Sequence, residues 1–296
     1  MRVGLEILKL ARSNGARTIF VVGTGRNAGK TTALRAIYNA AWNEGMRVAL
    51  ASIGRDGEAM VPIEAPSKPR LWLQPQTVFT TARALLPRSP AAELLKLSSL
   101  QSPAGEVLYA RAVIGGFYEL AGPPTASGVR EVVDELLARS EIAIVDGAVD
   151  RVAAVSGSDG AIVVAVGAGG TSSLQEAVAE IRALVTRLRV AEVDPGVSAV
   201  HVDGALTADA AAALIARGET RQIVVRDPTQ IALSGRAASE AFARLNVRCR
   251  RPLRVVAATV ASIGPERNFE PAQFANAVAA ATCLPTFDVY RSTKAA

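Results

Sequence analysis

The sequence contains little cysteine and histidine, and this argues against several kinds of site. Cys249 and Cys283 are its cysteines, and His201 is its single histidine. Two cysteines without metal-ligand spacing do not make a disulfide framework. A triad built on histidine, or a metal site of several histidines, would need more than His201, which lies in a strand-like run. Reduced thiols are typical of a cytoplasmic protein, and we expect that location.

Long hydrophobic runs are also missing. Crossing a bilayer takes roughly 20 apolar residues, and no uninterrupted apolar run in the sequence reaches that length. The opening stretch MRVGLEILKLARSNGARTIF is broken by Glu6, Lys9 and Arg12, so it favours a short helix over a signal peptide. We therefore expect no membrane partner.

Lysine is scarce, although the chain carries a net charge of +6. The arginines are spread along the chain with acidic residues between them, and the tightest cluster, at 244–254, lacks interleaved aromatics. A basic balance alone indicates solubility and steering, so we expect no nucleic-acid partner. The lysines are Lys9, Lys30, Lys68, Lys96 and Lys294. One of these few, Lys30, follows a glycine in a loop of small residues.

Short β-branched runs alternate with helical patterns along most of the chain, which is typical of a parallel sheet with helices on its faces. The strand-like runs are 18–23, 47–52, 141–146, 161–166, 198–203, 222–227 and 254–260. Helical patterns lie between several of them, at 30–43, 128–139, 172–188, 207–217 and 270–282. Such apolar strands are expected to be covered on both sides. We predict an α/β fold with a doubly wound, mostly parallel sheet, as one domain over residues 1–296.

Residues 60–125 interrupt this order with many prolines and short strand-like pieces. The prolines are Pro62, Pro66, Pro69, Pro75, Pro87, Pro90, Pro103, Pro123 and Pro124. We predict a partly β insertion between the second and third core strands, either a small subdomain or a lid. Its aromatic residues, among them Trp72 and Phe117, would suit a packed core or a contact surface.

The stretch VVGTGRNAGKTT, at 21–32, has the context that a phosphate-binding loop (P-loop) requires: a strand, a glycine-rich loop and a helix. The usual pattern G-x-x-x-x-G-K-[ST] would place its first glycine at position 24, where this chain has Thr24. The glycine comes one position earlier, at Gly23, which gives G-T-x-x-x-x-G-K-T. The alternative is a glycine-rich turn whose lysine is merely solvated.

Each part of this loop has an expected role toward ATP and Mg²⁺. The backbone N–H groups and the helix N-terminus would bind the phosphates. Lys30 would contact the β- and γ-phosphates, and the Thr31 hydroxyl would ligate Mg²⁺. Arg26 either clamps the γ-phosphate or points into solvent. The residues expected to bind nucleotide are Gly23, Thr24, Gly25, Arg26, Asn27, Ala28, Gly29, Lys30, Thr31 and Thr32.

Two carboxylates are candidates for the metal and the attacking water. Asp146 follows four apolar residues at the end of a strand-like run, and open α/β sheets bind ligands at that end. We expect it to hold Mg²⁺ or one of its water ligands. Asp56, in SIGRDGE after the second run, would position the attacking water or act as a second metal ligand. Both could also be ordinary turn residues, because Asp-Gly is a common turn pair.

A later run ends in VVRDPTQI, and Arg226 and Asp227 there are candidates for contact with the nucleotide base. No N-K-x-D stretch occurs, so the sequence shows no basis for guanine specificity. We therefore expect ATP.

The loop form G-T-x-x-x-x-G-K-T resembles that of dethiobiotin synthetase and the cobyrinic acid amidases, which are ATP-using proteins. This resemblance covers the first strand, the loop and the first helix. The dethiobiotin enzymes carry a substrate-activating lysine in a K-P pair after the second strand. This chain has Ile53-Gly54-Arg55-Asp56 there.

A second resemblance spans most of the chain. The stretches GTGRNAGKTT, ASIGRDGE, KPRLWLQPQT, SPAGEV, ELAGPP and IVDGAVDR together resemble the P-loop subunit of the lysine 5,6-aminomutase reactivase. This resemblance implies a factor that uses ATP to help a cobalamin-dependent aminomutase exchange damaged cofactor for adenosylcobalamin. It also implies the mutase and a second reactivase subunit as partners.

The main expectation is therefore a Mg-ATP-binding P-loop ATPase, an ATP hydrolase whose nucleotide cycle changes its contact with a partner protein. One alternative is an ATP-dependent ligase or kinase of the dethiobiotin-synthetase type that acts on a small carboxylate. Another is a nucleotide-binding regulator with negligible hydrolysis. Neither the loop nor the fold decides among them, and the oligomeric state, with a homodimer as one option, is open.

Overall fold

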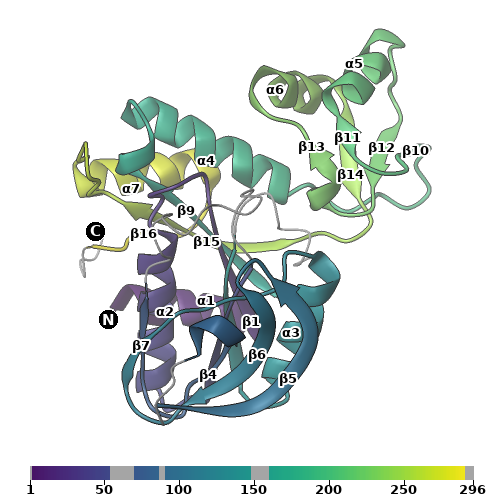
Figure 1. The fold of residues 1–296 in the computed structure, drawn as a ribbon. Helices are drawn as coiled ribbons and strands as arrows, with labels where there is room; N and C mark the ends of the chain where they lie inside the picture. The colour runs from purple at the N-terminus through teal and green to yellow at the C-terminus, as the bar shows by residue number, and fades with distance from the viewer. Residues whose placement is uncertain (1, 54–69, 87–90, 148–159, 291–296) are drawn as a thin grey trace.

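The computed structural model describes residues 2–53, 70–86, 91–147 and 160–290, and its centre is a nine-stranded sheet (Figure 1). The strand order is β16-β15-β9-β1-β8-β2-β4-β6-β5. Neighbouring strands from β16 to β4 are parallel, and β6 and β5 are added antiparallel. The bounds are β1 Thr18–Gly23, β2 Val48–Ser52, β4 Val78–Ala82, β5 Ala92–Ser102, β6 Gly105–Ala112, β8 Ile142–Asp146, β9 Ala161–Gly167, β15 Arg254–Ala261 and β16 Thr286–Asp288.

Helices cover both faces of this sheet, and each face has its own hydrophobic cluster. On one face α1 (Arg2–Ser13) and α2 (Lys30–Asn43) pack through residues such as Ile7 and Ile37. On the other face lie α3 (Ala126–Leu137), α4 (Leu174–Leu188) and α7 (Pro271–Thr282), with Ile181 and Phe274 in the core. The α/β class and the large, mostly parallel sheet are confirmed, and the arrangement is compatible with a doubly wound fold.

The central strands form where the sequence offers continuous apolar runs. Every residue of β1 and of β9 is buried, because helices lie on both sides of these strands. From β1 the chain first adds β2 and β4 on one side of the sheet. After β8, which lies between β1 and β2, it adds β9, β15 and β16 on the other side of β1. The carboxyl ends of β1 and its neighbours therefore flank the point where the strand order reverses, which is where open α/β sheets bind ligands.

The described part of residues 60–125 continues the central sheet on the β4 side. β4 pairs parallel with β2, and β6 and β5 follow as an antiparallel hairpin. The short strands β3 (Leu71–Leu73) and β7 (Gly116–Tyr118) make a separate two-stranded sheet. The buried Tyr38 hydroxyl of α2 ties this segment to the core, through a 2.7 Å hydrogen bond with Thr77 Oγ1 and by accepting one from the Gln74 N–H.

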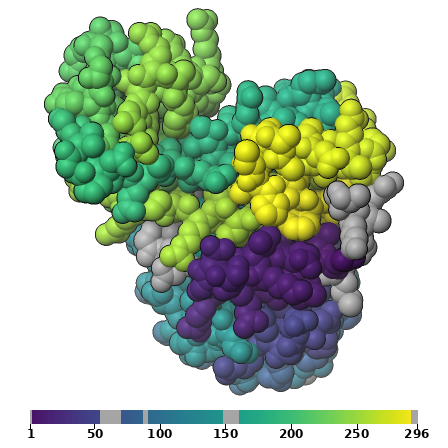
Figure 2. Space-filling model, turned by 180° about the vertical axis from the view of Figure 1, so that it is seen from behind, coloured from purple at the N-terminus to yellow at the C-terminus, as the bar shows by residue number. Residues whose placement is uncertain are grey.

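Residues from about 190 to 250 form a second lobe with its own sheets and its own core (Figures 1 and 2). The parallel strands β10 (Ala199–His201), β12 (Gln222–Val225) and β14 (Asn246–Cys249) make one sheet, and β11 (Leu206–Thr207) pairs with β13 (Ile231–Ala232). The helices are α5 (Ala208–Ala216) and α6 (Gly235–Arg244). The runs 198–203 and 222–227 therefore do not join the central sheet. The sequence pattern was misleading because a short apolar run predicts a strand in a covered parallel sheet but does not say which sheet the strand joins.

No helix in the described residues has the length and apolar character needed to span a bilayer.

Candidate functional site

The glycine-rich loop connects β1 to α2 at the carboxyl end of the central strands. It leaves the sheet after Gly23, and α2 begins at Lys30. The Thr24 N–H donates a 2.9 Å hydrogen bond to the Ala165 carbonyl, so the first loop residue still follows β9. The predicted strand, loop and helix are all present, at the edge where ligands bind in such sheets.

Two loop residues adopt the left-handed conformation that shapes this connection. Asn27 has a φ of 56° and Gly29 a φ of 84°. A side chain at Gly29 would also clash, because its Cβ would lie 2.6 Å from the Cβ of Ala261 on β15. Glycine is thus required at position 29 both for its conformation and for the close approach of β15.

Lys30 lies folded over the loop. Its Nζ donates a 2.7 Å hydrogen bond to the Gly25 carbonyl, five residues earlier in the chain. A side chain at Gly23 would obstruct this position, since its Cβ would lie 2.8 Å from Lys30 Cγ. Gly29 provides no side-chain cap for α2, so the first-turn amide groups are not capped in that way. An ammonium group and a helix N-terminus together at one loop can bind an anion.

The carboxyl end of β9 and the residues just after it support the loop from one side. A Cβ at Gly167 would lie 2.2 Å from the Asn27 carbonyl oxygen, and one at Gly170 would lie 3.0 Å from the Arg26 carbonyl oxygen. The backbone of the loop is therefore seated directly on residues 167–170. Arg26 is exposed and takes part in an interaction within the protein.

Asp146 ends β8, the strand next to β1. It is in register with Val21 of β1 and with Ser52 of β2, and its carbonyl accepts a 2.8 Å hydrogen bond from the Ile53 N–H. Its side chain is half-buried. The expected position at the carboxyl end of a neighbouring strand is confirmed, and its role toward a metal stays a prediction.

Other predicted residues lie outside the described part of the chain or away from this edge. Asp56 is in the stretch 54–69 and lies outside the described residues. Arg226 and Asp227 follow β12, in the sheet of the second lobe. The fully buried Asp227 carboxylate accepts hydrogen bonds from Arg226 Nε (2.8 Å), from the Thr229 N–H (3.0 Å) and from the Thr229 hydroxyl. It therefore stabilises the turn that it begins.

Over the described ranges, no three histidine, cysteine, aspartate or glutamate side chains come together in a way that could hold a metal ion. Mg²⁺ is commonly bound by one or two protein ligands together with phosphate oxygens and water. Thr31 and Asp146 would suffice for such a site.

Glu180, a residue that the sequence pattern did not reveal, lies beside the loop. It belongs to α4, and its exposed side chain lies beside Thr24. Partial desolvation raises the pKa of Glu180, the negative charge of Glu176 one helical turn earlier raises it further, and the nearby Thr24 hydroxyl lowers it. Only the packing of α4 against the central sheet brings this carboxylate to the loop.

Two further polar side chains were also missed, at the carboxyl ends of β15 and β16. Ser262 Oγ and Asp288 Oδ2 are buried and have no hydrogen-bond partner among the described residues. Ser262 is 1 % exposed and Asp288 9 % exposed. The adjoining residues touch the loop, since a Cβ at Gly29 would lie 2.6 Å from Ala261 and 3.7 Å from Val289. Buried polar groups of this kind usually have a partner.

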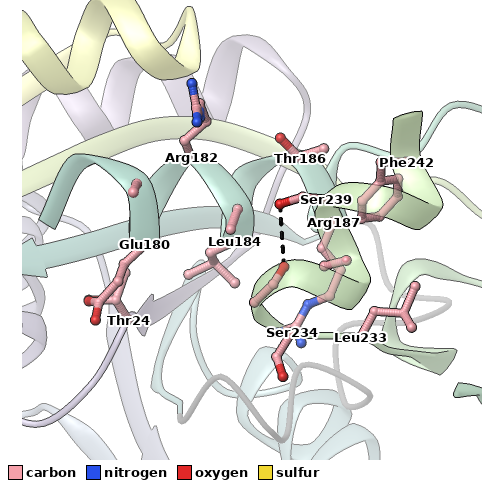
Figure 3. Close-up of a pocket in the computed structure, with 14 residues that line it drawn as sticks. Thr24, Glu180, Arg182, Leu184, Thr186, Arg187, Leu233, Ser234, Ser239 and Phe242 are labelled. Carbon is pink, nitrogen blue, oxygen red and sulfur yellow. Dashed lines mark hydrogen bonds between the residues drawn. The ribbon is translucent and has the colours of Figure 1, made fainter. Parts of the chain in front are cut away.

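A cleft of about 530 Å³ borders the loop at Thr24. One wall is α4, and the other is the Leu233–Phe242 segment of the second lobe (Figure 3). Glu180 and Thr24 lie side by side at one end, and Ser234, Ser239 and Phe242 lie toward the other. This volume is within the usual range for a small-molecule site, and the border between two units is a usual place for one.

No family model, no curated protein and no solved structure matches this chain.

Proposed function

We propose that residues 23–32 are a phosphate-binding loop for Mg-ATP and that the chain is a P-loop ATPase. This proposal rests on the geometry of the loop. The Lys30 ammonium group donates a hydrogen bond to the Gly25 carbonyl and so lies over the loop, and the N-terminus of α2 beside it has no side-chain cap from Gly29. A phosphate oxygen would replace that carbonyl as the acceptor for Lys30. Bound phosphates would also satisfy the first-turn amide groups.

The other roles follow from position. Thr31, in the first turn of α2, and Asp146, at the end of the adjacent strand, would hold Mg²⁺ or its water ligands. Mg²⁺ supplies charge neutralisation between the phosphates. Asp56 is proposed to position the attacking water, and Arg26 to contact the γ-phosphate.

We place the nucleotide base against the loops that follow β15 and β16. Ala261 at the end of β15 and Val289 after β16 lie against Gly29, and Asp288 Oδ2 is a buried acceptor without a partner in the described part of the chain, suited to an exocyclic amine. Ile263 and Tyr290, 55 % and 47 % exposed, provide apolar surface beside it. The buried and internally bonded Asp227 is less suited to that contact.

The proposed biological role is that of the family that the sequence resembles: a cytoplasmic factor whose ATP cycle changes its contact with a cobalamin-dependent aminomutase and a second reactivase subunit. The aromatic pair Trp72–Phe117 supports a protein partner. Its rings lie 5.1 Å apart, and the residues are 45 % and 62 % exposed. The ligase alternative requires a carboxylate substrate near the loop, where Glu180 would repel it.

The test is the binding of Mg-ATP and Mg-ADP to Lys30→Ala, measured by calorimetry. The variant should lose binding, because a charge-assisted hydrogen bond to phosphate is among the strongest that a protein makes. Its unfolding midpoint should stay near that of the wild type. Lys9→Ala, on the exposed face of α1, is the control and should bind as the wild type does. Unchanged affinity in Lys30→Ala would overturn the site assignment.

A further inference from the structure

The cleft between α4 and α6 is polarised along its length. At the end next to the loop, the exposed Glu180 lies beside Thr24 and one helical turn from Glu176. The other end is bordered by Arg187, two turns further along α4, and by Ser234. Since α4 rises about 1.5 Å per residue, the two positions are separated by roughly 10 Å along the helix axis.

The part of the cleft between these ends is apolar. Leu184 and Leu233 are buried, and Phe242 is half-buried at the far side. Figure 3 shows Leu184 pointing from α4 into the space between the two walls. Arg182 also borders the cleft, and its guanidinium points away from the opposite wall. The cleft therefore combines a carboxylate, an apolar wall and, beyond it, a cation.

A ligand's charge has different consequences at the two ends. Glu180 is exposed, and partial desolvation together with the neighbouring Glu176 disfavours its negative charge. A ligand cation beside Glu180 would offset this unfavourable effect on its negative charge, because an opposite charge stabilises an ionised carboxylate. An anionic group would be repelled at the same place. Arg187 would repel a cation at the far end, which fixes the orientation of the ligand.

We propose that this cleft binds a small organic ammonium ion, with its amine on Glu180 and its apolar chain along Leu184 and Leu233. This site goes beyond the proposed ATPase function, and its occupation does not require a nucleotide. Because Thr24 belongs both to the cleft and to the glycine-rich loop, a bound amine would lie next to the proposed phosphate site.

The test uses hexylammonium, hexan-1-ol and hexanoate as probes in calorimetry without nucleotide. For a ligand of this size we expect a Kd for hexylammonium of about 1 mM. Hexan-1-ol has the same chain without the charge and should bind roughly tenfold more weakly, the worth of a charge-assisted hydrogen bond. Hexanoate should bind more weakly than the alcohol.

Variants locate the site. Glu180→Gln should weaken hexylammonium binding roughly tenfold and leave the alcohol unchanged. Glu44→Gln, the same substitution at an exposed carboxylate that does not line the cleft, is the matched control and should bind as the wild type does. Ala183→Trp, at an exposed position in the cleft wall, should block all three probes.

Equal affinity for the amine and the alcohol, an unchanged amine affinity in Glu180→Gln, or no amine binding by the wild type would each overturn the proposal. Lys30→Ala should bind hexylammonium as the wild type does. The experiments can therefore refute the proposed nucleotide site without refuting the amine site, and the amine site without refuting the nucleotide site.

Discussion

Gly167→Ala tests whether the glycine-rich loop depends on the carboxyl end of β9. The new Cβ would lie 2.2 Å from the Asn27 carbonyl oxygen and 3.0 Å from Ala28 Cα, so the loop backbone has to move. Gly167 has extended backbone angles, φ −130° and ψ 152°, which alanine adopts without strain. Overpacking costs about 1–3 kcal/mol, and alanine in place of glycine returns about 0.4–1 kcal/mol through the unfolded chain. We expect a net loss of about 1–2 kcal/mol in the free energy of unfolding.

The assay is urea unfolding followed by tryptophan fluorescence, combined with calorimetry of Mg-ADP binding. The two tryptophans, Trp42 in α2 and Trp72 in β3, belong to elements packed on the central sheet, so their fluorescence reports this unit. Mg-ADP affinity should fall along with stability, because the displaced backbone is the proposed phosphate cradle.

Gly25→Ala is the matched control in the same loop. A Cβ at Gly25 would meet no atom within 4 Å, and its φ is not positive. Its unfolding free energy should stay within about 0.5 kcal/mol of the wild type, as is usual for a surface substitution. If Gly167→Ala is equally neutral, the loop is not seated on β9 as described, and the reasoning is refuted.

The other predictions concern the metal, the pH dependence of stability and the segment 60–125. Asp146→Asn should weaken Mg-dependent nucleotide binding, whereas Asp56→Asn should bind ATP normally and hydrolyse it slowly; equal loss of binding in calorimetry would contradict this division of roles. Burial, and then Glu131 and Glu135, raise the pKa of Tyr109 from 10.0 to about 12. The folded state therefore keeps a proton that the unfolded chain loses, so stability should fall as the pH rises from 10 to 12. The loss of stability between pH 10 and 12, measured from the midpoints of urea unfolding, should be smaller in Tyr109→Phe than in the wild type. The same dependence of the midpoint on pH in both proteins would contradict this prediction. Bound ATP should change the protease sensitivity of residues 60–125 more than that of the core. The same digestion pattern with ADP, with a non-hydrolysable ATP analogue and without nucleotide would exclude nucleotide sensing by this segment.

Local patterns predicted the central part of the fold well. The runs at 18–23, 141–146 and 161–166 are buried strands of one sheet, because uninterrupted apolar runs between helical patterns leave few other arrangements. Which strands share a sheet is decided by long-range packing. The run 222–227 shares the apolar Ile-Val-Val stretch of 161–166, yet most of it forms β12 of the second lobe, with a hydrophobic cluster of its own.

Some residues of the candidate site could likewise be predicted from the sequence, and others were found only in the structure. Loop residues such as Gly29 and Lys30 could be found in the sequence because their chemistry requires a fixed spacing along one turn. Asp146 could be found because it ends an apolar run. Glu180 could not, since it is one of two glutamates on α4 and only the packing of the helix brings it to Thr24. Asp288 likewise became a candidate only when its buried oxygen proved to have no partner.

The second lobe has a consequence for the order in which the molecule folds. β9 and β15 are paired along most of their length, but α4 and the whole lobe lie between Gly167 and Arg254 in the chain. Bringing together strands so far apart has an entropic cost that rises with the length of free chain between them. A lobe with its own hydrophobic cluster can fold first and shorten that free chain. We therefore expect β15 and β16 to join the central sheet late, so that the base-contacting edge of the proposed nucleotide site is the last part to form.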